Sequence, residues 1–188
     1  MCIRDRDWPQ GEIWGLGDQG TIAVLMEELE KVLATTENVK MIYVIPDFQN
    51  PTGRTWDLDR RHQFMDIVNR YEIPVIEDNP YGELRFEGEY LPALKSLDTK
   101  GLVIYLGTFS KILAPGYRLG WVCASDEILT KYNFMEQAAS LQASTIGQME
   151  TSKWIDMFDL DAHVSTIREC YKKRRAVMLE TCLLYTSD

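Results

Sequence analysis

The chain has 188 residues, of which 45% are hydrophobic and 11% aromatic, enough for one sizeable domain with an apolar core. Its formal net charge of −9 argues against contact with nucleic acid, because neutralising phosphates requires clustered lysine and arginine. No apolar stretch approaches the length of a membrane span, and no signal peptide is legible at the N-terminus.

The first half of the sequence alternates between helical and strand patterns. Thr21–Leu33 has apolar residues at helical spacing. Met41–Ile45 is a short, unbroken apolar run rich in β-formers, which is typical of a strand buried on both faces in a parallel sheet. Asp57–Tyr71 is predicted as a helix, and Pro74–Ile76 as the next short strand, which ends at Asp78.

The second half continues this alternation. Leu94–Leu97 is predicted as a short helical turn, Leu102–Leu106 as another buried strand and Leu119–Ala124 as a fourth strand. Three helices are then predicted, over Asp126–Leu141, Ile146–Phe158 and Asp161–Thr181. Strands that alternate with helices imply an α/β fold with a mostly parallel sheet and helices on both faces.

Three polar clusters each follow an apolar run. They are Asn50–Gly53, Asp78–Tyr81 and Thr108–Lys111, and Arg118 follows the last of them. In open α/β sheets, ligands bind beyond the carboxyl ends of the strands, where these clusters are expected. The order of the clusters therefore predicts a single site.

These clusters together resemble a known cofactor site. Asn50-Pro51-Thr52-Gly53, Asp78-Asn79-Pro80-Tyr81 and Thr108-Phe109-Ser110-Lys111 with Arg118 are similar to the pyridoxal 5′-phosphate (PLP) site of class I/II aminotransferases, which have fold type I. The resemblance extends over residues 26–182. It is strongest to the branch of 2-aminoadipate and aromatic amino acid aminotransferases, which also supplies the effector domains of MocR-type regulators. It implies PLP as the cofactor.

The resemblance implies catalytic roles for Lys111, Asp78 and Tyr81. Lys111 would form a Schiff base with the cofactor and then move a proton on the substrate, a task that requires a neutral amine, so we expect it to be buried near cations. Asp78 would accept a hydrogen bond from the protonated pyridine nitrogen and so keep the ring electron-withdrawing. Asn50 and Tyr81 would hydrogen-bond the phenolic oxygen of the cofactor.

The phosphate of the cofactor would be held by Thr108, Ser110 and Arg118, with Arg118 as a planar bidentate clamp. The family more often has serine at position 108, and threonine keeps the hydroxyl. Gly116 and Gly120 are expected to let the backbone pass close by or to make turns.

Each of these residues taken alone has a structural alternative. Asp78 precedes Asn79-Pro80 and could cap a helix, and Arg118 could form a surface ion pair. Lys111 could be a surface ammonium, and Asn50 a turn residue beside Pro51. Tyr81 could be a half-buried aromatic residue, so the functional interpretation depends on the combination.

The ends of the chain differ from the rest. Residues 1–6 and 183–188 resemble translated sequencing-adapter remnants, although ordinary frayed termini are the alternative. We expect residues 7–158 to be the central part of a PLP-binding large domain and residues 159–182 a helix that leads into a small domain outside this chain. The glycine-rich phosphate turn, the ring-stacking aromatic residue and the arginine that binds the substrate carboxylate are also expected outside it.

The resemblance implies an aminotransferase that passes an amino group from an α-amino acid to a 2-oxo acid, as a homodimer when full length. A fold-type-I lyase or decarboxylase is an alternative, because the same residues serve those reactions. A PLP-binding effector domain of a MocR-like regulator is another. The cysteines form no CxxC pair and have no histidine at metal-ligand spacing, which predicts no metal site and a reducing, cytoplasmic location.

Overall fold

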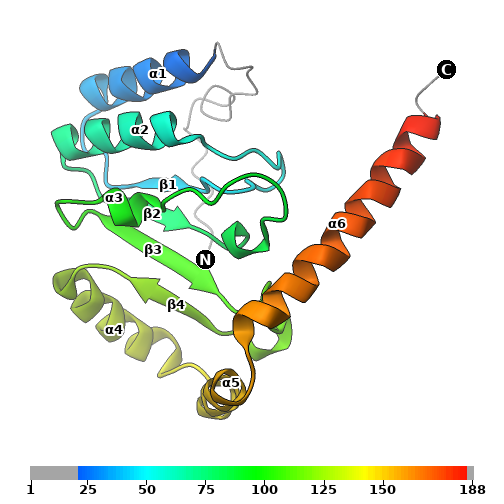
Figure 1. The fold of residues 1–188 in the computed structure, drawn as a ribbon. Helices are drawn as coiled ribbons and strands as arrows, with labels where there is room; N and C mark the ends of the chain where they lie inside the picture. The colour runs from blue at the N-terminus through cyan, green and yellow to red at the C-terminus, as the bar shows by residue number, and fades with distance from the viewer. Residues whose placement is uncertain (1–20, 186–188) are drawn as a thin grey trace.

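A four-stranded sheet forms the centre of the protein. The computed structural model describes residues 21–185. The strands lie in the order β1 (Ile42–Val44), β2 (Val75–Asp78), β3 (Val103–Thr108) and β4 (Gly120–Cys123). The first three are parallel, and β4 pairs with β3 in the antiparallel direction (Figure 1). The predicted α/β fold with a mostly parallel sheet is confirmed.

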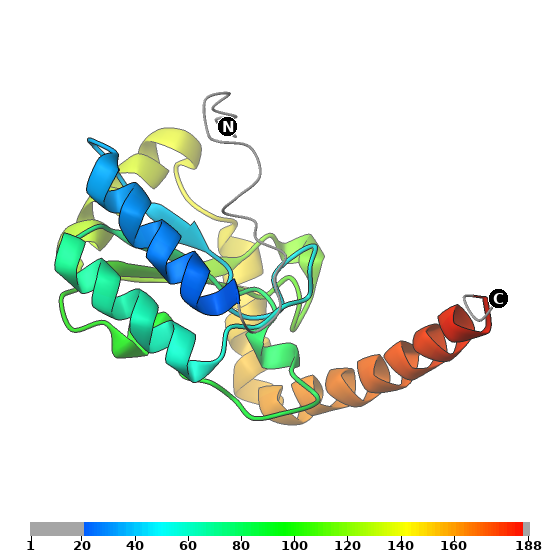
Figure 2. The same ribbon diagram turned by 90° about the horizontal axis from the view of Figure 1, so that it is seen from above.

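The helices lie on both sides of this sheet. Helices α1 (Thr21–Thr35) and α2 (Leu58–Tyr71) lie side by side on one face, and both views place α4 (Asp126–Ser140) on the other (Figures 1 and 2). The long α6 (Leu160–Tyr185) projects away from the sheet (Figure 2). The remaining helical elements are η1 (Gly82–Leu84), α3 (Leu94–Leu97), η2 (Pro115–Tyr117) and α5 (Thr145–Met157).

The apolar core lies between α1, α2 and α3 and one face of the sheet. Val75 and Val103 are fully buried there, beneath Phe64 and Val68 of α2 and Leu94 of α3. Fully burying side chains of this size stabilises a fold by about 1.5–3 kcal/mol each. The apolar face of α2 is thus the face that packs on the sheet.

Helix α2 has well-defined ends. Asp57 accepts a hydrogen bond from the backbone N–H of Arg60 at 2.8 Å, which satisfies one of the free donors of the first turn. At the other end Glu72 adopts a left-handed conformation, with φ 54°, and its N–H donates to the Val68 carbonyl. The predicted helix at Asp57–Tyr71 is confirmed, with Asp57 as its cap.

One detail of the predicted sheet is wrong. The strand at Met41–Ile45 was expected to be buried on both faces, but Tyr43 is 53% exposed, on the face opposite the core. The antiparallel direction of the fourth strand is compatible with the predicted, mostly parallel sheet. It arises because residues 109–119 form a short connection with no crossover helix, which a parallel return requires.

Helix α6 is longer and more exposed than its sequence pattern predicts. The helix continues past the predicted end at Thr181 to Tyr185. Val164 is buried at its base, whereas Met178 is 68% exposed because this part of the helix projects from the fold (Figure 2). Some of the predicted segments lie outside the described residues. They are residues 1–6 and 186–188 of the predicted non-native ends and residues 7–20 of the predicted large domain.

A buried ion pair fixes the loop that follows β1. Arg61 of α2 is fully buried, and its guanidinium donates to Asp47 Oδ1 at 2.8 Å. It also donates to the carbonyl oxygens of Trp56, at 3.2 Å, and Pro92, at 3.0 Å. Arg85 donates to the same Asp47 oxygen at 3.0 Å. One arginine therefore joins α2, both ends of the loop and the segment before α3.

A second buried carboxylate lies close to this pair. Glu77 of β2 is fully buried, and its two oxygens accept the backbone N–H groups of Leu94, at 2.9 Å, and Lys95, at 2.8 Å. Burial raises the pKa of Glu77, while these N–H groups and the charge of Arg61 act in the opposite direction. Glu77 thus anchors the start of α3 to the sheet.

We predict that Arg61→Ala lowers the free energy of unfolding by about 3–5 kcal/mol, because it leaves the buried carboxylate of Asp47 without its main partner. Urea denaturation followed by circular dichroism measures this loss. The matched control is His62→Ala, an exposed neighbour on the same helix, which should change stability by less than about 0.5 kcal/mol. Equal effects of the two changes would contradict a special role for the ion pair.

Candidate active site

The predicted site residues lie at one edge of the sheet. Asp78 is the last residue of β2 and Thr108 the last residue of β3. Asp78 pairs with Leu106 in the register of these parallel strands, so Asp78 and Thr108 face the same side. The loop with Asn50 follows β1, whose carboxyl end is at this edge too. The topology therefore collects the three clusters at one end of the sheet.

Asp78 is held by a tyrosine from the neighbouring strand. Tyr43 of β1 donates its hydroxyl to Asp78 Oδ2 at 2.5 Å, within the range of strong charge-assisted hydrogen bonds. Partial burial, the hydrogen bond to Asp78 and the charge of Asp78 raise the pKa of Tyr43 well above its usual range. The tyrosine therefore remains a donor at physiological pH.

Asp78 does not cap a helix, so this alternative interpretation is wrong. Asn79 makes the local turn instead, since its Oδ1 accepts the N–H of Gly82 at 2.8 Å. A side chain at Gly82 would bring its Cβ within 2.5 Å of that oxygen, so glycine is required there. Asn79 also contacts Tyr105, whose pKa is raised to about 12 by burial and by nearby carboxylates. This turn places Tyr81, which is half-buried.

The loop with Asn50 is closed by its own hydrogen bonds. The side-chain oxygen of Gln49 accepts from the hydroxyl of Thr52 at 2.7 Å and from its N–H at 3.1 Å. Gly53 has a φ of 69°, which favours glycine, and donates its N–H to the Gln49 carbonyl. Asn50 is exposed at the tip of the loop. In this position Asn50 can be a turn residue and still offer its side chain to a cofactor, so the two predicted roles are compatible.

Asn50 and Tyr81 line the same cavity, which has a volume of about 680 Å³. Its walls come from residues 48–53, from the segment after β2 and from Tyr171 and Arg175 of α6. Arg85 connects two of these walls, because its guanidinium lies 4.7 Å from the ring of Phe48 and binds the Asp47 carboxylate. The structure thus brings Asn50 and Tyr81 together.

The segment with Lys111 is held at its base by the residue that precedes β4. Phe109 donates its N–H to the Leu119 carbonyl at 3.1 Å, and the Thr108 hydroxyl donates to the same oxygen at 3.3 Å. The Thr108 oxygen in turn accepts the N–H of Ser110 at 3.1 Å. Thr108 and Ser110 are therefore adjacent, as a shared phosphate site requires.

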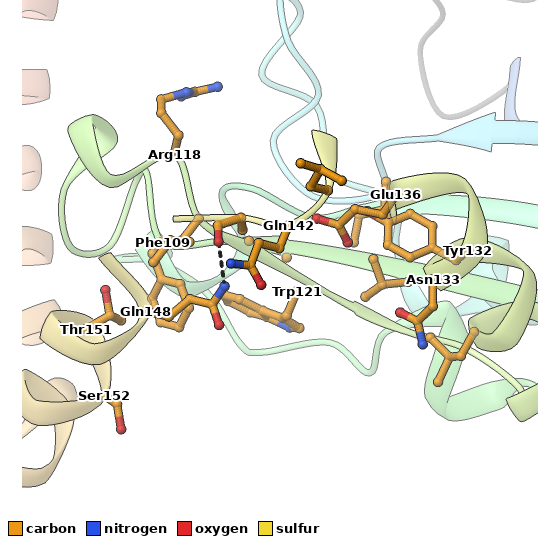
Figure 3. Close-up of a pocket in the computed structure, with 18 of the residues that line it drawn as sticks. Phe109, Arg118, Trp121, Tyr132, Asn133, Glu136, Gln142, Gln148, Thr151 and Ser152 are labelled. Carbon is orange, nitrogen blue, oxygen red and sulfur yellow. Dashed lines mark hydrogen bonds between the residues drawn. The ribbon is translucent and has the colours of Figure 1, made fainter. Parts of the chain in front are cut away.

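An aromatic pair lies beneath this segment. The rings of Phe109 and Trp121 are 4.9 Å apart, and the indole of Trp121 covers Gly107, where a Cβ atom would overlap it (Figure 3). A Cβ at Gly120 would lie 2.6 Å from the Gly107 carbonyl oxygen, so Gly120 allows the close backbone approach expected of it. A Cβ at Gly116 would meet no atom within 4 Å, so no close approach requires glycine there.

Lys111 and Arg118 are exposed, so the expected burial of Lys111 is not found. Within the described part of the chain, Lys111 Nζ makes no hydrogen bond or ion pair. Arg118 has a left-handed backbone, with φ 54°, and its guanidinium contacts the Pro115 carbonyl at 3.5 Å. Figure 3 shows Arg118 extended away from the other labelled side chains. The structure does not bring Arg118 onto Thr108 and Ser110.

A second cavity, of about 1040 Å³, lies between β4, α4 and α5. Arg118 is at its margin, and Phe109, Trp121, Tyr132 and Gln148 line it (Figure 3). The predicted site residues are thus divided, with Asn50 and Tyr81 at one cavity and Arg118 at the other. Asp78 and Lys111 belong to neither lining.

Three contributions to this site were missed from the sequence. Tyr43 is in an apolar run with nothing nearby in sequence to suggest a carboxylate partner. Arg61 is one of several charged residues in α2, and only its place on the apolar face suggests burial. Gly107 precedes Thr108 inside a strand, and an interior glycine is a recognisable signal of close approach.

Within residues 21–185, no group of three His, Cys, Asp or Glu side chains is arranged to hold a metal ion. Over the same range, no helix combines the length and the apolar character that crossing a bilayer needs. Cys123 and Cys170 form no disulfide and are exposed. The groups available for chemistry at the sheet edge are therefore the carboxylate, phenol, hydroxyl, amide, amine and guanidinium groups already described.

The family of the chain follows from this sequence and fold. Residues 14–183 match the family model for aminotransferase class I and II, and the chain belongs to this family. It is 42% identical to aromatic-amino-acid aminotransferase 1 of Thermococcus litoralis over 174 residues. These aligned residues make up 92% of this chain and 42% of that protein.

Solved structures agree with this assignment. The multiple substrate aminotransferase from Thermococcus profundus has a TM-score of 0.82 and 42% identity, over 89% of this chain and 41% of that one. LysN, an α-aminoadipate aminotransferase from Thermus thermophilus, was solved with N-(5′-phosphopyridoxyl)-L-leucine. It has a TM-score of 0.79 and 32% identity, over 87% of this chain and 42% of that one. The chain thus spans about two fifths of the length of these relatives.

A transcriptional regulator is also similar to the chain. The HTH-type transcriptional regulator YisV of Bacillus subtilis is 30% identical over 149 residues, which is 79% of this chain and 31% of that protein. The matches confirm the predicted resemblance to the aromatic and 2-aminoadipate aminotransferases and to regulators that share their fold.

We predict that Gly107→Ala destabilises the protein by about 1–3 kcal/mol, because the added methyl group displaces Trp121 and its contact with Phe109. Gly116→Ala is the matched control and should have little effect on stability, since the added atom would meet open space. Urea denaturation measures both. A Gly107→Ala protein as stable as the control would show that the close packing of Trp121 is dispensable.

Proposed function

We propose that the full-length protein is a PLP-dependent aminotransferase that transfers an amino group from an α-amino acid to a 2-oxo acid. The main support is the ordered set of groups at the sheet edge, Asp78, Thr108, Ser110 and Lys111, in a chain that matches the aminotransferase family almost throughout. The name of the Thermococcus litoralis relative supports aromatic amino donors, and that of LysN supports 2-aminoadipate or similar ones.

The residues of the chain fit the parts of this cofactor. PLP supplies, when bound, an aldehyde that combines with amines and a pyridine ring that withdraws electrons. A carboxylate suits the protonated ring nitrogen, and Asp78 is already oriented at one oxygen by Tyr43. Hydroxyl groups and a guanidinium suit a phosphate, and Thr108 and Ser110 are adjacent, with Arg118 on the same connection.

Each residue then has a defined task. Lys111 would hold the cofactor covalently through Nζ, and its amine, once released by the substrate, would accept the proton from the substrate Cα. Asp78 binds the ring nitrogen, and Asn50 and Tyr81 bind the phenolic oxygen from the cavity that they share. Thr108 and Ser110 bind the phosphate. Arg118 must turn from its contact with Pro115 to join them.

We also propose the organisation of the whole protein. Residues 7–158 belong to the large domain and residues 159–182 lead into the small domain. A homodimer is supported by the many large apolar side chains that α4 and α5 expose, such as Phe134, Leu141 and Ile146. Cys123 and Cys170, which form no disulfide, support a reducing, cytoplasmic location.

The regulator similar to this chain supports a second candidate function. In an effector domain of that kind, the same residues would bind PLP without rapid turnover. The two candidates differ in their products. An aminotransferase mixed with an amino donor and an acceptor forms a new 2-oxo acid continuously, whereas a sensor retains PLP and forms almost none.

We predict that Lys111→Ala in the full-length protein lowers the rate of 2-oxo acid formation by at least about 10²-fold, the usual scale for loss of general acid–base catalysis. Reduction of the PLP-loaded wild type with borohydride, followed by peptide mass spectrometry, should find the cofactor attached to Lys111. Lys153→Ala, an exposed lysine of α5, is the matched control and should retain activity. Attachment at another lysine would refute the assignment.

A further inference from the structure

We propose that Tyr43 is a positioning residue that orients the carboxylate of Asp78 for the ring nitrogen of the cofactor. This inference rests on the proposed function. Tyr43 lies outside the three sequence clusters. Only the pairing of β1 with β2 brings it to Asp78.

The strand register places the two residues together. Tyr43 pairs with Ile76 in the parallel β1–β2 ladder, and Asp78 lies two residues further along β2, on the same face of the sheet. The Tyr43 hydroxyl reaches the last residue of β2 and donates to Asp78 Oδ2 at 2.5 Å. The contact therefore follows from the register, since a shift by one residue would point Tyr43 to the other face.

This hydrogen bond fixes the remaining freedom of Asp78. Its backbone is already held by strand pairing with Leu106, and the next N–H, of Asn79, donates to the Leu106 carbonyl at 3.0 Å. The side chain could still rotate. With Oδ2 bound by Tyr43, rotation of the carboxylate is restricted, and Oδ1 makes no hydrogen bond within residues 21–185. One oxygen orients the group, and the other is available to the ring nitrogen.

Packing does not account for Tyr43. The residue is 53% exposed and lies on the face opposite the core, so its ring contributes little apolar burial. The pKa of Tyr43 is held above its usual range, so the hydroxyl keeps its proton and acts as a donor to the carboxylate. The polar contact with Asp78 is thus the main interaction of the side chain.

The test is a double-mutant cycle in the full-length protein with Tyr43→Phe and Asp78→Asn. We expect Tyr43→Phe to weaken PLP binding by about 10-fold, near the lower end of what a hydrogen bond to a charged group contributes. In the Asp78→Asn background the same change should have almost no further effect, because Tyr43 acts through Asp78. PLP titration measures the dissociation constants.

A spectroscopic readout separates orientation from general stability. With ¹⁵N-labelled cofactor, Tyr43→Phe should shift the ring-nitrogen resonance toward that of the Asp78→Asn protein, while the urea midpoint stays close to wild type. Tyr71→Phe is the matched control, a tyrosine of α2 that packs near the core, and should move neither the resonance nor the dissociation constant.

The outcomes distinguish this inference from the proposed function. If the wild type binds PLP on Lys111 but Tyr43→Phe changes neither binding nor the resonance, only the role of Tyr43 is overturned. Independent losses from Tyr43→Phe and Asp78→Asn would also overturn it, because they would show that the two residues do not act together. If the wild type binds no PLP, the proposed function fails first and the role of Tyr43 with it.

Discussion

The arrangement of the site depends on one buried arginine. The guanidinium of Arg61 has no contact with solvent, so its charge is tolerable only because it is paired with Asp47 and hydrogen-bonded to two carbonyl groups. Asp47 also binds Arg85, which follows the segment with Tyr81. The loop that carries Asn50 and the segment that carries Tyr81 are therefore attached to the same carboxylate oxygen. The cavity between them has its shape because of this shared contact.

A different device supports the lysine segment. Hydrogen bonds from Thr108 and Phe109 to the Leu119 carbonyl close its base, and Trp121 fills the space above Gly107. Lys111 itself is exposed. The backbone of the segment is thus fixed while the amine is free to move, which is a suitable combination for a group that must both hold a cofactor and transfer a proton.

Local sequence patterns predicted most of the fold. The unbroken apolar runs identify β2 and β3, and Asp57 identifies the start of α2, because these features depend on neighbouring residues. The direction of β4 depends on the length of a connection, and the partner of Asp78 depends on strand register across 35 positions. The expected burial of Lys111 was based on the need of proton transfer for a neutral amine, which no local sequence pattern tests. This chain spans about two fifths of the length of its relatives.

The long helix α6 has a mechanical consequence. Near its base, Arg168 donates to the Glu83 carbonyl at 2.7 Å and lies over the ring of Tyr90, and further along Arg175 pairs with Glu87 at 3.1 Å. The helix is therefore attached to the segment that follows Tyr81, while its other end extends away (Figure 1). A helix of 26 residues is about 39 Å long, so it acts as a lever arm. A tilt of about 5° at its base displaces the far end by about 3 Å. A displacement of the far end is in turn transmitted to the segment that follows Tyr81.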